Sequence, residues 1–116
     1  MKKKNIFITG SSKGIGFNLA KHLINRKDVE VIINGRNKKN LIRASKNLKK
    51  CKYVLGDVSN VNNLRKINKK IKEIDILICN VGNGKSAKPG KEKFKDWLKS
   101  LKENFFSTVN TIKSFE

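Results

Sequence analysis

Three glycines near the start of the chain have the spacing of a phosphate-binding turn. Gly10, Gly14 and Gly16 form a G-x-x-x-G-x-G pattern directly after an apolar run at residues 5–9, and a helical pattern follows. A helix that begins at such a turn directs its unpaired N–H groups and positive dipole end at one point. The glycines permit positive φ, open approach of a phosphate and close packing of helix on strand. We therefore predict a nucleotide site, whose phosphate-binding turn comprises Gly10, Ser11, Ser12, Gly14, Ile15 and Gly16.

Two cations accompany this turn. Arg36 follows the second apolar run, at the sheet edge where an adenosine ribose would lie. An acidic residue there would accept from the 2′-hydroxyl of NAD, but the chain has Gly35 at that position. Arg36 and Lys13 suit a 2′-phosphate instead, so we predict NADP as the cofactor in preference to NAD. The alternative is that both are simply two more cations of a basic protein.

Strand and helix patterns alternate along the chain, which predicts an α/β fold with right-handed crossovers and a parallel sheet. Short β-branched runs indicate strands buried on both faces, and apolar residues at spacings of three and four indicate helices. Glycine, lysine and proline indicate a loop at residues 83–93. The expected strands cover residues 5–9, 29–33, 53–55 and 74–79, and the expected helices cover residues 15–24, 41–48, 61–71 and 94–115, the last as one helix or two.

The segment from Thr9 to Gly16, Thr-Gly-x-x-x-Gly-Ile-Gly, resembles the short-chain dehydrogenase/reductase family. The resemblance runs from about Lys4 to the end of the chain. It implies a Rossmann-type doubly wound parallel sheet with strand order 3-2-1-4. It also implies hydride transfer between a nicotinamide and a carbonyl or secondary alcohol, with a small-molecule substrate and the cofactor supplying the chemistry.

The resemblance implies roles for further residues. Asp57 and Val58 match the family's adenine-contacting pair, and Asn80 and Gly82 keep two positions of its Asn-Asn-Ala-Gly segment, whose first and third positions differ here. Asn104 matches the helical asparagine that holds a water in the family's proton relay, and is our catalytic candidate. The alternative for Asp57 is that it only forms a turn, and the alternative for Asn104 is that it is an ordinary surface residue of a helix.

The family's catalytic Tyr-x-x-x-Lys would lie beyond Glu116, and Tyr53 has Asp57 four places on. We therefore expect one domain, residues 1–116, corresponding to the cofactor-binding half of such an enzyme and truncated after about four strands. It should bind nucleotide without turning over substrate, and its bare fourth strand should favour self-association. The rival interpretation is a catalytically inactive nucleotide-binding module or partner subunit.

Charge raises a third possibility, a nucleic-acid-binding protein. Lys and Arg number 28 against nine acidic residues, for a net charge of +19. The lysines are spread over every segment, which favours compositional drift, and we expect the aromatic residues between positions 94 and 115 to face inward rather than form a stacking platform. We therefore predict no specific nucleic-acid partner. The 94–115 stripe resembles the helix that family members use to dimerise, which implies a homo-oligomer.

Cys51 and Cys79 are far apart in the sequence and form no C-x-x-C pattern. The chain contains a single histidine. We predict free thiols in a reducing compartment and no metal site. The apolar run behind the N-terminal lysines is too short for a secretion signal or a membrane span. The expected location is the cytoplasm.

Overall fold

A computed structural model of the protein describes residues 2–83 and 87–116. Its four strands form one parallel sheet in the order β3-β2-β1-β4, which confirms the predicted α/β class and strand order. The strands are β1 (Lys4–Ile8), β2 (Val29–Gly35), β3 (Lys52–Leu55) and β4 (Ile76–Ile78).

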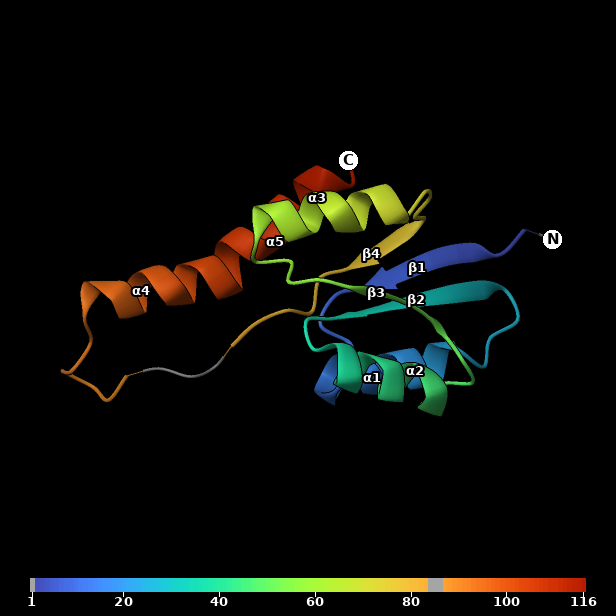
Figure 1. The fold of residues 1–116 in the computed structure, drawn as a ribbon, viewed down its shortest axis with the longest axis horizontal. Helices are drawn as coiled ribbons and strands as arrows, with labels where there is room; N and C mark the ends of the chain where they lie inside the picture. The colour runs from blue at the N-terminus through green and yellow to red at the C-terminus, as the bar shows by residue number, and fades with distance from the viewer. Residues whose placement is uncertain (1, 84–86) are drawn as a thin grey trace.

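Helices cover both faces of the sheet, as in a doubly wound fold. Figure 1 shows α1 and α2 on one side, and α3 and α5 on the other. The chain remains helical from α4 to α5 through a π-helical segment, η1. The helices are α1 (Gly14–Leu23), α2 (Lys38–Asn47), α3 (Val61–Lys70), α4 (Phe94–Leu101), η1 (Lys102–Phe106) and α5 (Ser107–Ser114).

Each face of the sheet has its own apolar core, because successive side chains of a strand point to opposite faces. Ile8 of β1 is fully buried in the core that also contains Leu41 of α2. Its neighbour Phe7 is fully buried in the second core with Ile67 of α3. Phe115 completes that second core, with its ring centroid 5.5 Å from that of Phe7 in an edge-on contact. The two cores fix the helices on the strands that carry the loops of the candidate site.

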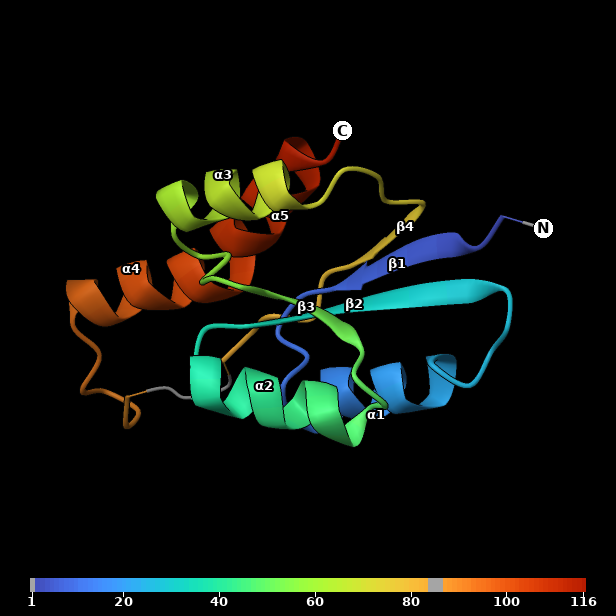
Figure 2. The ribbon, with the colours of Figure 1, turned by 45° about the vertical axis from the view of Figure 1, so that its right-hand side comes forward.

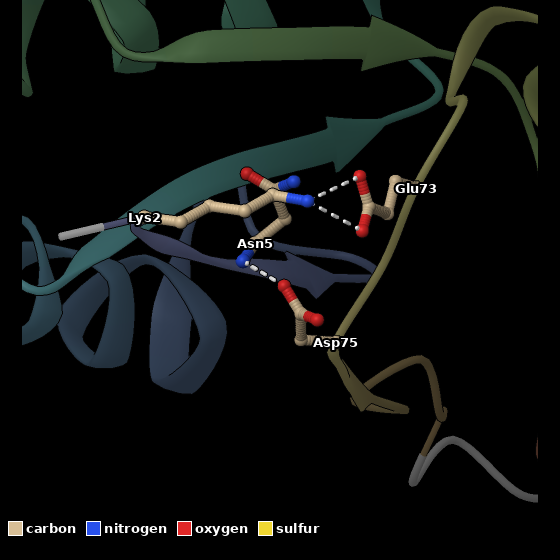
Figure 3. Close-up of polar contacts among 4 residues, drawn as sticks. All are labelled: Lys2, Asn5, Glu73 and Asp75. Atoms are coloured by element: carbon tan, nitrogen blue, oxygen red, sulfur yellow. Dashed lines mark hydrogen bonds and ion pairs between the residues drawn. The ribbon is translucent and has the colours of Figure 1, made fainter.

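Paired polar groups align β4 with β1 at the amino-terminal edge of the sheet. The N–H of Asn5 donates to Oδ2 of Asp75 at 2.7 Å, and the N–H of Asp75 donates to the carbonyl of Asn5 at 2.9 Å. Lys2 forms an exposed ion pair with Glu73 just before this point, at 3.1 Å (Figure 3). The register brings the carboxyl ends of β1 and β4 to the same level.

The fourth strand is shorter than the predicted range of residues 74–79. It pairs over Ile76–Ile78, and its carboxyl end follows from its neighbour β1, which ends at Ile8, the partner of Ile78. Beyond that pair, β1 turns away into the glycine-rich segment, so Cys79 has no partner in the ladder. The sequence pattern gives the apolar run but not the point at which its neighbour ends.

The expectation that the 94–115 aromatics face inward is confirmed only for Phe115, because Phe105 and Phe106 are 56% and 46% exposed. Phe94 is 76% exposed and Trp97 is 61% exposed. Figures 1 and 2 show α4 extending past the sheet, and its apolar residues Leu98 and Leu101 are also exposed. One of the two sequence-based reasons for setting nucleic acid aside therefore loses its basis, and the even spread of the lysines along the sequence remains.

Residues 84–86 of the predicted loop lie outside the described residues, and its remainder holds a turn closed by Lys91 N–H donating to the Lys88 carbonyl at 2.9 Å. Among the described residues, no helix is both long and apolar enough to cross a membrane.

Candidate functional site

The carboxyl ends of the strands surround a cleft of ≈ 440 Å³. It is the place where doubly wound folds bind ligands, because the loops that leave the strands diverge there. Side chains or backbone of most of the predicted cofactor-binding residues line it. These are Gly10, Ser12, Lys13, Gly14, Ile15, Arg36, Asp57, Val58, Asn80 and Gly82.

The glycines of the turn meet two different requirements, close packing and open space. Gly10 has φ of +56°, and a Cβ there would lie 2.9 Å from Cγ2 of Val81. Gly14 has φ of +66°, and a Cβ there would meet no described atom within 4 Å. A Cβ on Gly16 would lie 2.5 Å from Nδ2 of Asn80 and 2.7 Å from the Gly10 carbonyl. Gly10 and Gly16 therefore permit close packing, whereas Gly14 keeps the space before the helix open.

The first turn of α1 differs from those of α2 and α3. Asn37 and Asn60 cap α2 and α3, each accepting a backbone N–H at 3.0 Å. Lys13 stands at the corresponding position of α1, and within the described part of the chain no side chain caps that helix. Its unpaired N–H groups and the cation of Lys13 are thus available to an anion. Ile15, which was predicted to belong to the phosphate-binding turn, is 81% exposed at the cleft.

Ser11 and Gly16 lie beneath the turn instead of on the cleft surface. Ser11 is fully buried, and its hydroxyl donates to the Ile8 carbonyl at 2.7 Å and accepts from the Asn34 N–H at 2.9 Å. Its own N–H donates to the Asn34 carbonyl at 2.7 Å. In the structure, Ser11 therefore braces the turn with groups that were expected to face a phosphate.

The β4 loop is fastened to the same turn. The N–H of Asn80 donates to Oγ1 of Thr9 at 2.9 Å, and its side-chain Nδ2 donates to the Gly10 carbonyl at 3.0 Å. Thr9 is buried, so its hydroxyl acts as a fixed acceptor between β1 and β4. These bonds place Asn80 and Gly82 on the wall of the cleft opposite the end of β2.

The corner at the end of β2 combines a cation with a close backbone contact. Arg36 is exposed and lines the cleft. A Cβ on the buried Gly35 would lie 3.0 Å from Oγ and 3.1 Å from Cβ of Ser12. An acidic side chain at position 35 would therefore require Ser12 to move, which leaves Arg36 and Lys13 as the charged groups of this corner.

Asp57 and Val58 lie where β3 ends. Oδ1 of Asp57 accepts from the N–H of Ser59 at 2.9 Å and from its hydroxyl at 2.6 Å, which is an Asx-type turn. The side chain of Val58 is buried in the second core. Asp57 therefore combines the turn-forming role with a position on the cleft.

Asn104 lies on η1 at the end of the cleft, and its amide is engaged within the protein. It contacts the backbone of Asn83 and the carbonyl of Ser100, while its neighbour Glu103 lines the cleft and accepts from Nδ2 of Asn83 at 2.9 Å. A π-helical turn at this position is typical of functional sites. In this structure, the Asn104 side chain holds the β4 loop, and its predicted part in a proton relay stays a prediction.

Sequence reasoning missed Asn34. It was interpreted as the end of a strand, yet it is 1% exposed and bonds to two of the loops that form the cleft. The available signal was a polar residue directly after a β-branched run, since a buried amide requires partners. Glu103 and Asn83 were also missed, because only the fold brings η1 and the loop after β4 together.

The cysteines take no part in the cleft. Burial raises the pKa of the Cys51 thiol to about 11, and its Sγ lies 3.1 Å from the Val31 carbonyl. Burial also raises the pKa of Cys79. Both thiols are free, and the described residues contain no group of three or more His, Cys, Asp or Glu side chains that could hold a metal ion.

Comparison with known proteins gives a family match over almost the whole chain. The model of the short chain dehydrogenase family matches residues 4–115. A 3-oxoacyl-[acyl-carrier-protein] reductase FabG of Rickettsia typhi is 35% identical over 117 residues, covering 95% of this chain and 47% of the relative. A gluconate 5-dehydrogenase of Gluconobacter oxydans is 35% identical over 98 residues, covering 78% of this chain and 38% of the relative. The chain thus spans about half the length of the curated relatives it matches.

Solved structures show the same fold at lower identity. An actinorhodin polyketide ketoreductase determined with NADPH superposes with a TM-score of 0.87 at 19% identity, covering 98% of this chain and 48% of that one. The RhlG/NADP complex of Pseudomonas aeruginosa superposes with a TM-score of 0.89 at 22% identity, covering 99% and 47%. These likenesses confirm the Rossmann-type arrangement of the four strands.

Proposed function

Because the chain belongs to the short chain dehydrogenase family, we propose that residues 1–116 form the NADP(H)-binding part of an oxidoreductase. The reaction would transfer hydride between the nicotinamide and a small carbonyl or secondary alcohol substrate. Two relatives named above are a reductase and a dehydrogenase, and two similar structures contain NADPH or NADP. The cofactor preference of this chain rests on its own residues.

The observation that carries the proposal is the open start of α1. The helix lacks a side-chain cap among the described residues, its first residue is Gly14 with open space at the Cβ position, and Lys13 stands beside it. Aligned N–H groups with a neighbouring cation fit a diphosphate, which needs several donors and no side chain in its path. The capped starts of α2 and α3 offer no comparable arrangement.

The rest of the cleft fits the other parts of a dinucleotide. Arg36 and Lys13 would hold a 2′-phosphate, and the contact between Gly35 and Ser12 leaves little room for the acid that NAD would require. Asp57 would accept from the adenine amine, because its Oδ2 has no partner among the described residues. On the other wall, Asn80 and Gly82 would approach the second ribose. These placements support NADP over NAD.

Catalysis requires groups that this sequence does not contain in the family's pattern. Its single tyrosine, Tyr53, is followed by Asp57 at the position where the family has lysine. The proposal for the isolated chain is therefore nucleotide binding without turnover. The two free cysteines support a reducing, cytoplasmic location.

A pair of glycine variants tests the site. Gly14→Ala and Gly90→Ala each add one methyl at a positive-φ position where no described atom lies within 4 Å, so their backbone strain is matched. Only Gly14 lies at the start of α1. We expect Gly14→Ala to weaken NADP⁺ binding at least tenfold in calorimetric titration, with Gly90→Ala at the wild-type value. Equal affinities for the two variants, or no binding by the wild type at millimolar NADP⁺, would contradict the proposal.

A further inference from the structure

Asn34 of β2 is a buried polar side chain whose three partners come from two separate segments. Its Oδ1 accepts from the N–H of Gly10 at 3.1 Å. Its Nδ2 donates to the carbonyl of Val54 at 3.0 Å and to the carbonyl of Gly56 at 3.1 Å. Only 1% of the residue is exposed. One amide thus joins the turn after β1 to the end of β3 and the turn that follows it.

The backbone of β2 repeats the same connection. The N–H of Asn34 donates to Oγ of Ser11, and the N–H of Ser11 donates to the carbonyl of Asn34. On the other side, the N–H of Gly56 donates to the carbonyl of Gly35 at 2.9 Å. Because a buried amide that loses a partner is costly, displacement of either turn disturbs bonds that also hold the other.

The two turns carry different parts of the proposed nucleotide site. The first leads into Lys13 and Gly14 at the start of α1, and the second leads into Asp57. A diphosphate and an adenine would therefore bind to loops that share one buried amide.

We propose that Asn34 is a positioning residue that couples the diphosphate and adenine parts of the site, so that the placement of one turn fixes the other. The identity of the ligand in this inference rests on the proposed function. The coupling of the two turns rests on the hydrogen bonds alone. A merely structural amide would stabilise the fold without transmitting a local defect from one turn to the other.

Asn34→Asp separates these roles. Its carboxyl keeps an acceptor for the N–H of Gly10 and, when protonated, at most one donor toward Val54 and Gly56, so the lost bond lies on the β3 side. Exchange is followed at two pH values, because a buried carboxylate would add a charge that acts on both turns directly. Hydrogen-exchange mass spectrometry of the free protein then follows residues 9–16 and residues 56–60, each normalised to residues 6–8 of the core strand. We expect exchange at least fivefold faster in both segments. Faster exchange in residues 56–60 alone would overturn the coupling.

Ser45→Ala is the matched control, because it also removes a buried side-chain bond to backbone. The Ser45 hydroxyl donates to the carbonyl of Cys51 at 2.5 Å, far from the cleft. We expect unchanged exchange in residues 9–16 and 56–60. If Asn34→Asp fails to fold, Asn63→Ala leaves Asn34 intact and removes only the acceptor of the Asp57 N–H on the β3 side. It should still speed exchange in residues 9–16 as well as in residues 56–60, and acceleration in residues 56–60 alone would again refute the inference.

Binding measurements add the ligand. Titration with adenosine 2′,5′-bisphosphate and with NADP⁺ should show at least tenfold weaker affinity for Asn34→Asp and less than twofold change for Ser45→Ala. An equal loss in both variants would show that Asn34 contributes stability alone. If the wild type binds neither compound, the proposed function fails, while the exchange data still decide whether the two turns are coupled.

Discussion

Asn104 holds the backbone of Asn83 at two points. Its Oδ1 accepts from the N–H of Asn83 at 2.6 Å, and its Nδ2 donates to the carbonyl of the same residue at 3.1 Å. This pairing joins the helix η1 to the loop after β4, which forms one wall of the cleft. A Cβ on Gly82 would lie 3.1 Å from the same Oδ1, so the loop passes closely over the amide.

We expect Asn104→Ala to weaken NADP⁺ binding by roughly fivefold, because the two lost bonds at a partly solvated site are together worth about 1 kcal/mol. The same loss should lower the melting temperature by about 4 to 8 °C. Calorimetric titration and thermal unfolding measure the two effects. Asn110→Ala, the same substitution further along this helix, should leave the affinity at the wild-type value. A Tm loss without any change in affinity would contradict this role.

Arg36→Ala tests the preference for NADP. A charge-assisted bond to a 2′-phosphate contributes about 1.5 to 3 kcal/mol, so the affinity for NADPH should fall roughly tenfold to a hundredfold. The affinity for NADH, which lacks that phosphate, should change far less. Titration of both cofactors gives the ratio, and Arg65→Ala on α3 is the charge-matched control. Equal losses of NADPH and NADH affinity would remove Arg36 from the site.

Gly35→Asp tests why the acidic residue is absent from the ribose corner. Its Cβ would lie within 3.0 to 3.1 Å of two Ser12 atoms, so the single variant should lose about 1 to 2 kcal/mol of unfolding free energy from overpacking. Adding Ser12→Gly removes both contacts and should restore most of that loss, while the new carboxylate shifts the preference toward NADH. Urea unfolding and cofactor titration measure the two results. A single variant as stable as wild type would show that Ser12 moves aside freely.

The order of the elements and the glycine turn could be predicted from local signals in the sequence. The turn was predictable because Gly10, Gly14 and Gly16 act through their own backbone and their immediate neighbours. Asn34 was not, because its side-chain partners lie 20 to 24 residues away and meet it only when three strands align. The end of β4 depended in the same way on where β1 stops.

The error on Trp97 has a different cause. Apolar spacing of three and four identifies one face of a helix, but it does not say whether another element covers that face. Here α4 extends beyond the sheet, so the same pattern produces an exposed stripe instead of a core. Asp57 and Asn80 were predicted as cleft residues from the family resemblance. Their spacing in the sequence gives no sign that the two residues lie at one site.

The two thiols should differ in reactivity. With its pKa at about 11, Cys51 is about one part in a thousand thiolate at pH 8, so iodoacetamide should modify it at least about a hundredfold more slowly than free cysteine. Cys79 is only half-buried, so it should react before Cys51. Mass spectrometry of the alkylated peptides gives both rates, and urea should make them equal. Faster labelling of Cys51 in the native protein would contradict its burial.

The raised pKa of Cys51 also sets a direction for stability. The unfolded chain releases this proton near pH 9 and the folded chain near pH 11, so the folded state binds more protons between these values. The contribution of the thiol to the unfolding free energy is therefore present at neutral pH and declines as pH rises from 9 to 11. Comparison with Cys51→Ala at each pH isolates it from the lysines. A wild-type advantage that grows over this range would reverse the sign.

The exposed stripe of α4 should make the chain self-associate. Trp97 is 61% exposed beside Phe94, Leu98 and Leu101, a contiguous set of apolar side chains of the kind that marks interaction surfaces. Trp97→Lys should raise the dissociation constant of the oligomer by at least about tenfold, because burial of such a side chain contributes more than 1.4 kcal/mol. Sedimentation velocity measures it, and Val61→Lys on α3 is the control.

Salt separates this association from binding to a contaminating polyanion. With a net charge of +19, two copies of the chain repel one another, so raising the salt concentration from 50 to 500 mM screens the repulsion and should strengthen apolar association. Assembly on nucleic acid has the opposite dependence, because salt competes with the released counterions. Larger species that dissolve in high salt and persist in Trp97→Lys would therefore identify the lysines, not the α4 stripe, as the source of assembly.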